Sequence, residues 1–238
     1  FFGLKEVVKE RALKKLNNMK DREILITSGS QQALHLIFSS MLKVGDWVLV
    51  EEPTYPAAIR ILKEKGAQIE TVKMKDGGPD IKEITRIFDS RPLKMAYLMP
   101  RFHTPTGFSY DEKVKKTVSD LSKKHGVYIV EDNSYGELDF ETHKEVPLTV
   151  EAVLHIYLSS FSKTFLSGAR IGTCICGNEV YEKLTKAKLD HDLSSPLFFQ
   201  MVLAKYIMSG HYDTRLKELN KLSKNKFDEI RQGMKVSS

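Results

Sequence analysis

A lysine and an arginine in one short segment are the residues whose types and spacing suggest chemistry most directly. Lys163 stands in the segment LSSFSKT, just after the apolar residues of an expected strand, and Arg170 follows it in GARIG. A lysine at the end of a buried strand, among small hydroxyl residues, is in surroundings that can make its amine nucleophilic. An arginine can hold a phosphate with two parallel hydrogen bonds. An isolated lysine is usually a surface charge, but this context favours a reactive amine beside an anion site.

Two further segments place polar residues directly after apolar runs. In TSGSQQ, Gly29 allows a tight turn, and Ser30 with the first free amides of a helix makes a seat suited to a phosphate. Alternatively, Ser30 only caps that helix. In VEDNSY, Glu131 and Asp132 end an apolar run. Such carboxylates can be metal ligands, helix caps or partners of a buried cation, and their spacing does not choose among these roles.

Two loops complete the set of polar segments. PRFHTPTG is an irregular loop held by two prolines, in which His103 is more readily explained as a packing residue than as a base. EEPTYP brings the ring of Tyr55 to a similar sheet edge, and on local evidence this ring belongs to the rim of the core.

Short apolar runs alternate with stretches of helical periodicity, and these elements would position the polar segments. Such alternation implies crossover connections and an α/β fold, with a mostly parallel sheet covered by helices. In such a sheet, ligands bind beyond the carboxyl ends of the strands, where the polar segments stand. The expected strands are 24–27, 47–50, 68–72, 95–99, 127–130, 155–159 and 171–176, and the helices between them are 30–43, 56–65, 80–88, 111–125 and 178–191.

Both ends of the chain have helical patterns without strands. After Pro196 two helices are expected, at 197–209 and 211–235. We therefore expect a large domain over residues 1–209 and, over 210–238, an interdomain helix leading to a small domain that is largely absent. A first helical stripe, with no initiator Met before it, suggests that something precedes residue 1. This stripe consists of Leu4, Val7, Val8, Ala12 and Leu16.

Composition and charge exclude several classes of protein. Of the 238 residues, 41% are hydrophobic and 29% are charged, which is typical of a folded globular chain. The formal charge of +6 comes from scattered lysines, which favours a solvated face over a nucleic-acid site. There is neither an apolar run long enough to span a membrane nor a signal peptide, so we expect the cytoplasm. Cys174 and Cys176 would share one face of a strand, and we expect packing residues rather than a disulfide or a zinc site.

Taken together and in this order, five segments resemble the motifs of fold-type-I pyridoxal-phosphate enzymes of the aminotransferase class I/II family. The segments are TSGSQQAL, EEPTYP, PRFHTPTG, EDNSY and SFSKTFLSGARIG, and the resemblance spans about residues 20–210. It implies the large domain of a PLP-dependent transferase, with pyridoxal 5′-phosphate as the cofactor.

The resemblance implies a role for each motif residue. Lys163 would form the Schiff base with the cofactor and, once released, shuttle a proton between the substrate carbon and the cofactor. Asp132 would pair with the pyridine nitrogen, so that the ring can accept electrons. Tyr135 would lie near the 3-hydroxyl of the cofactor, and Tyr55 would stack on its ring. The residues implied at or beside the phosphate are Ser30, Gln31, Ser160, Ser162 and Arg170.

This chain departs from the family pattern at one motif and at both ends. Where Asn-Pro-Thr-Gly is usual, it has Thr104-Pro105-Thr106-Gly107. In most relatives that Asn donates a hydrogen bond to the 3-oxygen of the cofactor, and a threonine hydroxyl is shorter and differently placed. We expect Thr104 to affect turnover more than cofactor binding. The family's segment ahead of residue 1 and its small domain, which provides an arginine for the substrate carboxylate, are also missing, so this chain alone is not expected to complete a transamination cycle.

Two functions from different classes fit the resemblance. The first is an amino-acid aminotransferase with a 2-oxo acid acceptor. The second is the effector-sensing domain of a MocR-type regulator of the GntR family, which joins a winged helix-turn-helix to an aminotransferase-like domain. The missing ends and Thr104 favour the regulator, whereas Asp132, Tyr135, Lys163 and Arg170 indicate only cofactor binding.

The resemblance also implies partners. An amino acid or amine is the expected substrate or effector. A homodimer is expected, because in relatives the cofactor sites lie at the subunit interface. A regulator would bind DNA only through an absent N-terminal domain, and no membrane contact is expected.

Overall fold

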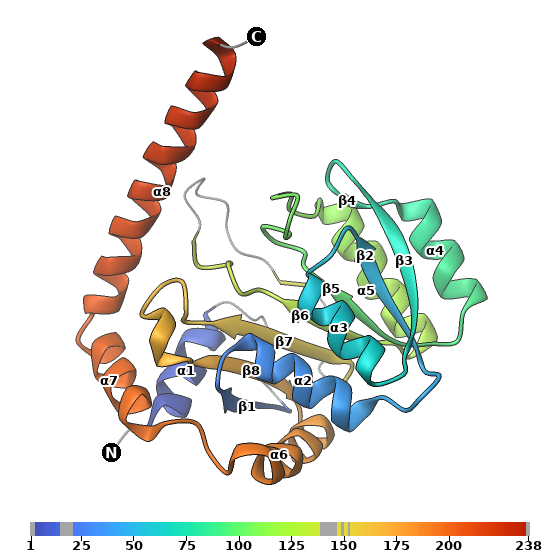
Figure 1. Ribbon diagram of the computed structural model, residues 1–238, viewed down its shortest axis with the longest axis horizontal. Helices are drawn as coiled ribbons and strands as arrows, with labels where there is room; N and C mark the ends of the chain where they lie inside the picture. Colours follow the sequence, from blue (N-terminus) through green and yellow to red (C-terminus); the bar gives the residue numbers. More distant parts are fainter. Residues whose placement is uncertain (1–2, 15–20, 139–146, 149, 152, 237–238) are drawn as a thin grey trace.

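The computed structural model describes residues 3–14, 21–138, 147–148, 150–151 and 153–236. One sheet runs through the molecule, and helices cover both of its faces (Figure 1). The strands lie in the order β1-β8-β7-β6-β5-β2-β3-β4. Their bounds are β1 Arg22–Thr27, β2 Trp47–Glu52, β3 Gln68–Lys75, β4 Gly78–Pro79, β5 Leu93–Leu98, β6 Tyr128–Asp132, β7 His155–Ser160 and β8 Gly172–Gly177.

The sheet is mostly parallel, as predicted. Strands β3, β2, β5, β6 and β7 pair in parallel, whereas β8 is antiparallel to both of its neighbours, β7 and β1. Residues 161–171 between β7 and β8 are too few for the helical crossover that a parallel connection needs, so the chain turns back instead. Since β1 and β7 both run opposite to β8, they run in the same direction as each other, and their carboxyl ends lie at the same edge of the sheet.

The helices form two layers on this sheet. Helices α2, α3 and α6 cover one face, and α1, α4, α5 and α7 cover the other. A short 3-10 helix, Ser167–Ala169, and strand β4 were not expected from the sequence. The helix bounds are α1 Leu4–Leu13, α2 Ser30–Met41, α3 Pro56–Glu64, α4 Ile81–Ser90, α5 Glu112–His125, α6 Asn178–Asp192, α7 Leu197–Met208 and α8 His211–Val236.

Alternation along each strand divides the core between the two faces. In β2, Val48 and Val50 pack under α2 and α3, whereas Leu49 faces α4 and α5. Cys174 and Cys176 point to the same face, fully buried and unpaired, which confirms the packing role predicted for them. Since helices cover both faces of the sheet, the sequences of its central strands are nearly continuous runs of apolar residues.

Helices α1 and α7 lie on the side of β1 (Figure 1). Helix α1 packs on α7, and the predicted stripe is buried at Leu4, Val7, Val8 and Ala12, while Leu16 lies outside the described residues. Helix α8 extends away from the body of the molecule (Figure 1). The division into a large domain and an interdomain helix stays a prediction, although α8 begins close to the predicted boundary.

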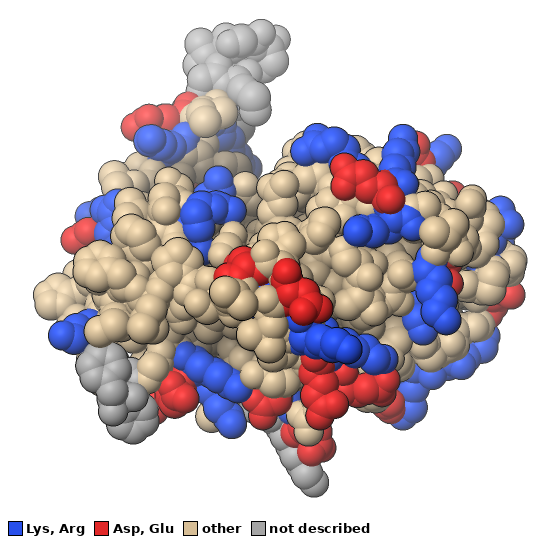
Figure 2. Space-filling view, turned by 60° about the horizontal axis from the view of Figure 1, so that its bottom comes forward, with Lys and Arg blue, Asp and Glu red and all other residues tan. Residues whose placement is uncertain are grey.

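The charged surface has the mixed character expected from scattered lysines. Figure 2 shows Lys and Arg interleaved with Asp and Glu over one face. Several lysines are paired with neighbouring carboxylates, for example Lys183 with Glu179 and Lys124 with Asp89, both at 2.7 Å. Among the described residues, no helix is both long and apolar enough to cross a membrane. The cytoplasmic location stays a prediction.

Candidate active site

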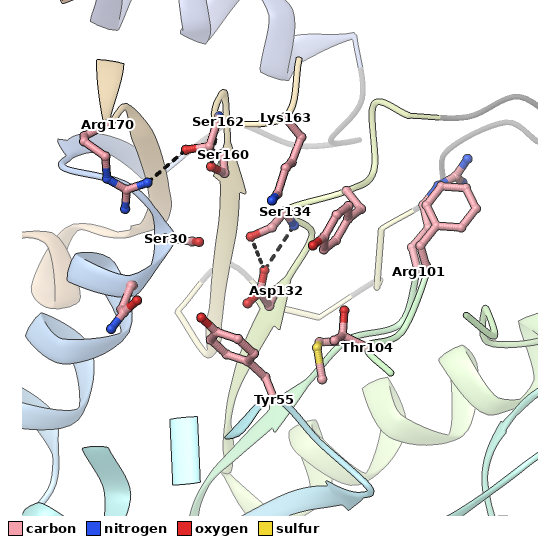
Figure 3. A pocket seen from close by; sticks show the side chains of 14 residues that line it. Ser30, Tyr55, Arg101, Thr104, Asp132, Ser134, Ser160, Ser162, Lys163 and Arg170 are labelled. Atoms are coloured by element: carbon pink, nitrogen blue, oxygen red, sulfur yellow. Dashed lines mark hydrogen bonds between the residues drawn. The ribbon is translucent and has the colours of Figure 1, made fainter. Parts of the chain in front are cut away.

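A cavity of about 200 Å³ lies at the carboxyl edge of the sheet, where the loops after β1, β2, β5, β6 and β7 meet (Figure 3). Every residue that the sequence singled out as a site residue lines it. Other lining residues are Met99, Arg101, Phe102 and Ser134. The predicted residues that it brings together are Ser30, Gln31, Tyr55, Thr104, Asp132, Tyr135, Ser160, Ser162, Lys163 and Arg170.

Positively charged groups gather at one end of the cavity. Helix α2 begins at Ser30 after Gly29, with no side-chain cap, so Ser30 is the first helical residue and not the cap that the alternative interpretation required. The first amides of a helix carry partial positive charge and favour anions. Arg170 lies beside them, with its Nη1 3.4 Å from Ser162 Oγ and its Nη2 3.4 Å from the Ser28 carbonyl oxygen.

Two glycines make this close approach possible. A Cβ at Gly29, where φ is +91°, would stand 2.6 Å from Arg170 Nη2, and a Cβ at Gly172 would stand 2.7 Å from the Gly29 carbonyl carbon. Both contacts are too short for real atoms, so larger residues would displace α2 or Arg170. Arg170 itself has φ +50°, which is uncommon for a residue with a side chain and is often found at functional sites.

Asp132 is the last residue of β6 and lies in the middle of the cavity (Figure 3), where three donors hold its carboxylate. Its Oδ1 accepts from the Ser134 amide at 3.0 Å and the Ser134 hydroxyl at 2.6 Å, and its Oδ2 accepts from the Tyr97 hydroxyl at 2.9 Å. Burial raises the pKa of the Asp132 carboxyl, and these hydrogen bonds only partly oppose that rise. A carboxylate has about four acceptor sites, so Oδ2 can still receive one donor from the cavity.

Lys163 reaches into the cavity from the turn after β7 (Figure 3). Its amine lies 5.8 Å from the centre of the Tyr135 ring. Tyr55 lines the same space and also packs against the core, which confirms its place at the rim of the core, while stacking on a cofactor ring stays a prediction. Thr104 lies on the side of the cavity opposite Arg170 (Figure 3).

Two polar residues named from the sequence lie outside the cavity. Glu131 points to the opposite face of the sheet from Asp132, where its Oε2 accepts from the Leu148 amide at 3.0 Å and lies 2.8 Å from His155 Nε2. His103 is 1% exposed and is held by Thr106, with Nδ1 and Oγ1 2.8 Å apart, which confirms the packing role. Alternation therefore separates a structural carboxylate from one that faces the site.

The sequence interpretation missed two residues that determine the surroundings of Asp132. Ser134 stands in a motif already noted, and its position two residues after a carboxylate could have suggested the local hydrogen bond. Tyr97 lies on β5, within an apolar run, and only the pairing of β5 with β6 brings its hydroxyl to Asp132. A buried phenol needs a polar partner, which was the available signal.

The family model described as aminotransferase class I and II matches residues 3–236, nearly the whole chain. The chain belongs to the aminotransferase class I and II family. Its fold agrees with that membership: the crystal structure of Pyrococcus horikoshii kynurenine aminotransferase in complex with PMP superposes with a TM-score of 0.93 at 30% identity. The match covers 98% of this chain and 59% of that one.

Relatives within the aminotransferase class I and II family include enzymes and regulators. The 2-aminoadipate transaminase of Thermus thermophilus is 31% identical over 214 residues, which are 87% of this chain and 53% of that protein. The uncharacterised HTH-type transcriptional regulator YisV of Bacillus subtilis is 31% identical over 229 residues, 94% of this chain and 47% of that protein. The chain thus spans about half the length of these relatives.

Proposed function

We propose that this domain binds pyridoxal 5′-phosphate as a Schiff base on Lys163 and transfers an amino group from an amino acid to a 2-oxo acid. The observation that supports this most strongly is the single cavity that collects residues from five separate loops, including Lys163, Asp132 and Arg170. The PMP in the P. horikoshii relative supports the choice of cofactor.

The residues around the cavity fit the parts of that cofactor. The seat formed by Gly29, Ser30 and Arg170 suits its phosphate, because the missing Cβ atoms leave backbone amides and a guanidinium close together. Tyr55 and Tyr135 offer aromatic surfaces for its ring. The remaining acceptor site of Asp132 suits its pyridine nitrogen, and a proton held there would favour the ionised carboxylate that burial otherwise disfavours.

When bound, the cofactor supplies an electron sink for the bond that breaks at the substrate carbon. The protein would supply the proton transfer: the free amine of Lys163 would take the proton from the substrate α-carbon and deliver it to the cofactor. Asp132 would hold a proton at the pyridine nitrogen of the bound cofactor. Thr104 lines the cavity where the family's Asn usually lies, and its shorter hydroxyl reaches less far towards the site.

Adding pyridoxal phosphate and then single amino acids to the protein tests this function. We expect an absorbance band of an imine near the visible edge, which an amino donor converts to the band of the amine form while one equivalent of 2-oxo acid appears. The names of these two relatives suggest 2-aminoadipate and kynurenine for the first panel of amino acids. A protein that shows no imine band contradicts the proposal.

The sensor half of a MocR/GntR-type transcription regulator is the second candidate, and the similarity to YisV over 94% of this chain favours it. A sensor would form the imine band and change it with an effector, but it would release no 2-oxo acid. DNA binding would then come from a helix-turn-helix domain ahead of Phe1, so the native sequence upstream of Phe1 distinguishes the two candidates.

We also propose that residues 1–209 form the large domain and that 210–238 lead to a small domain outside this chain, since the chain spans about half the length of its relatives. The exposed apolar side chains at the end of α8, Leu222, Phe227 and Ile230, would then be covered by that domain.

A homodimer through the α7 face is the partner that we propose. Apolar side chains crowd this face, which is mostly tan at the left of Figure 2, and Phe198 is 70% exposed. We expect Phe198→Glu to convert a dimer to a monomer in sedimentation, because a buried charge at an interface is strongly unfavourable. Val44→Glu, at an 86% exposed position in the turn before β2, is the control and should stay dimeric. A dimer that survives Phe198→Glu places the interface elsewhere.

A further inference from the structure

The turn that carries Lys163 is bound from outside the site by the first turn of α8. Tyr212, which is fully buried, lies with its hydroxyl oxygen 2.7 Å from Thr164 Oγ1, and Thr164 directly follows the lysine. The same hydroxyl hydrogen-bonds Glu137 Oε2, two residues beyond Tyr135 in the loop after β6. One phenol on α8 therefore contacts both loops that present site residues from β6 and β7.

The direction of these hydrogen bonds follows from proton counting. A phenol has one proton, and an ionised carboxylate can only accept, so Tyr212 donates to Glu137 and the Thr164 hydroxyl donates to the phenol oxygen. Burial raises the pKa of Tyr212, and the neighbouring charge of Glu137 raises it further, so the phenol stays protonated. Each of the three groups then has a defined place in the chain of hydrogen bonds.

Arg11 of α1 pairs with Glu137 and completes the network. Its Nη2 lies 3.0 Å from Glu137 Oε1, its Nη1 lies 2.7 Å from Asp213 Oδ1, and its guanidinium stacks 4.7 Å from the centre of the Tyr212 ring. Burial opposes the charged form of Arg11, but the two carboxylates outweigh it and raise its pKa. The network therefore joins α1, α8 and both loops through charge-assisted hydrogen bonds, which are stronger than neutral ones.

Beyond this network, α8 contacts the body of the molecule through Leu216, which packs against the core around Tyr212, and through Asn220, whose Nδ2 donates to the Glu137 carbonyl oxygen at 3.2 Å. Its later turns project outward (Figure 1), and Leu222, Phe227 and Ile230 along them are exposed. A tilt or rotation of α8 therefore moves Tyr212 with it, and Tyr212 is bound to the residue beside Lys163.

We propose that Tyr212 is a positioning residue that couples the direction of α8 to the amine of Lys163. Whatever α8 leads to would then act on the site through the bond between Tyr212 and Thr164. The effect on the cofactor rests on the proposed function, whereas the coupling of α8 to the lysine turn does not.

Hydrogen exchange without cofactor tests the coupling. The Phe165 amide donates to the Phe161 carbonyl oxygen at 2.9 Å and closes the turn that contains Lys163, so its exchange reports opening of that turn. Tyr212→Phe keeps the buried ring and removes only the hydroxyl, and we expect this amide to exchange about three- to tenfold faster, the effect of losing one hydrogen bond. Tyr206→Phe is the matched control, because its ring stands 6.4 Å from that of Tyr212 while its hydroxyl lies outside the network.

A second variant separates coupling from general destabilisation. Thr164→Val removes the other hydroxyl of the same bond, so the double variant with Tyr212→Phe should exchange no faster than the faster single variant. With pyridoxal phosphate added, the pH midpoint of the imine band should also shift in Tyr212→Phe and stay unchanged in Tyr206→Phe.

Two results overturn the coupling: equal exchange at Phe165 in the two tyrosine variants, or additive effects in the double variant. If Tyr212→Phe does not fold, the exchange of the Phe165 amide in Thr164→Val is the test. Exchange in that variant as slow as in the wild type rejects the coupling. If the wild type forms no imine band, the proposed function fails while the exchange measurement still decides on Tyr212.

Discussion

Lys163→Ala is expected to abolish the imine absorbance of the protein with pyridoxal phosphate completely. An imine requires the amine of Lys163, which points into the cavity towards Ser134 and lies 5.8 Å from the centre of the Tyr135 ring. The phosphate seat at Ser30 and Arg170 is untouched, so the cofactor should still bind, but noncovalently. Any transamination should fall by about 10²–10⁴-fold, because the residue that moves the substrate proton is lost.

The control for this experiment is Lys116→Ala, which removes an exposed lysine on α5 that does not line the cavity. It should leave the band unchanged. A band of wild-type intensity in Lys163→Ala would show that another amine holds the cofactor and would falsify the assignment of the site.

Asp132→Asn is expected to lower turnover on the order of 10²-fold, an effect typical of removing one buried electrostatic partner in a site. Asparagine keeps the shape of Asp132 and can still accept from Ser134, but it brings no negative charge to a protonated pyridine nitrogen. The imine band should therefore form, while its conversion by amino acids becomes slow. Unchanged turnover in Asp132→Asn would mean that this carboxylate does not support the cofactor ring.

Without cofactor, the same substitution should make the folded protein more stable at neutral pH. Burial raises the folded-state pKa of Asp132 above its unfolded value, so the folded protein binds the proton more tightly. The free energy of unfolding therefore falls as pH rises above about 4 through the folded pKa, and the loss is complete above that pKa. Asparagine does not ionise, so its free energy of unfolding does not fall in this way. The stability of Asp132→Asn relative to the wild type should therefore increase as pH rises from about 4 to 7.

Asp89→Asn provides a control of opposite sign. A hydrogen bond from Lys124 lowers the pKa of this exposed carboxyl, so its contribution to stability is present above the unfolded pKa and is lost as pH falls. Denaturant titrations of both variants across this pH range should give slopes of opposite direction. Parallel curves would contradict the unfavourable burial of the Asp132 charge.

Much of the site could be predicted because its residues follow strands. Apolar runs mark the strands of a parallel sheet, and the carboxyl ends of such strands meet at one edge, so Ser30, Tyr55, Asp132 and Lys163 could be expected together. Arg170 follows β7 through a short turn and comes to the same edge. These patterns are local in the sequence, so they can be recognised without knowing the order of the strands in the sheet.

The sequence by itself determined the α/β class, the motif residues and their resemblance to the aminotransferase class I and II family. Only the tertiary structure decided that Ser30 begins α2 rather than capping it, that Glu131 faces away while Asp132 faces the cavity, and that Tyr97 binds Asp132 from β5. It also decided that Tyr212 meets Thr164, which is 48 residues away along the chain. Such pairings depend on the order of the strands and on how helices pack across them, and the apolar periodicity of a single segment does not specify either.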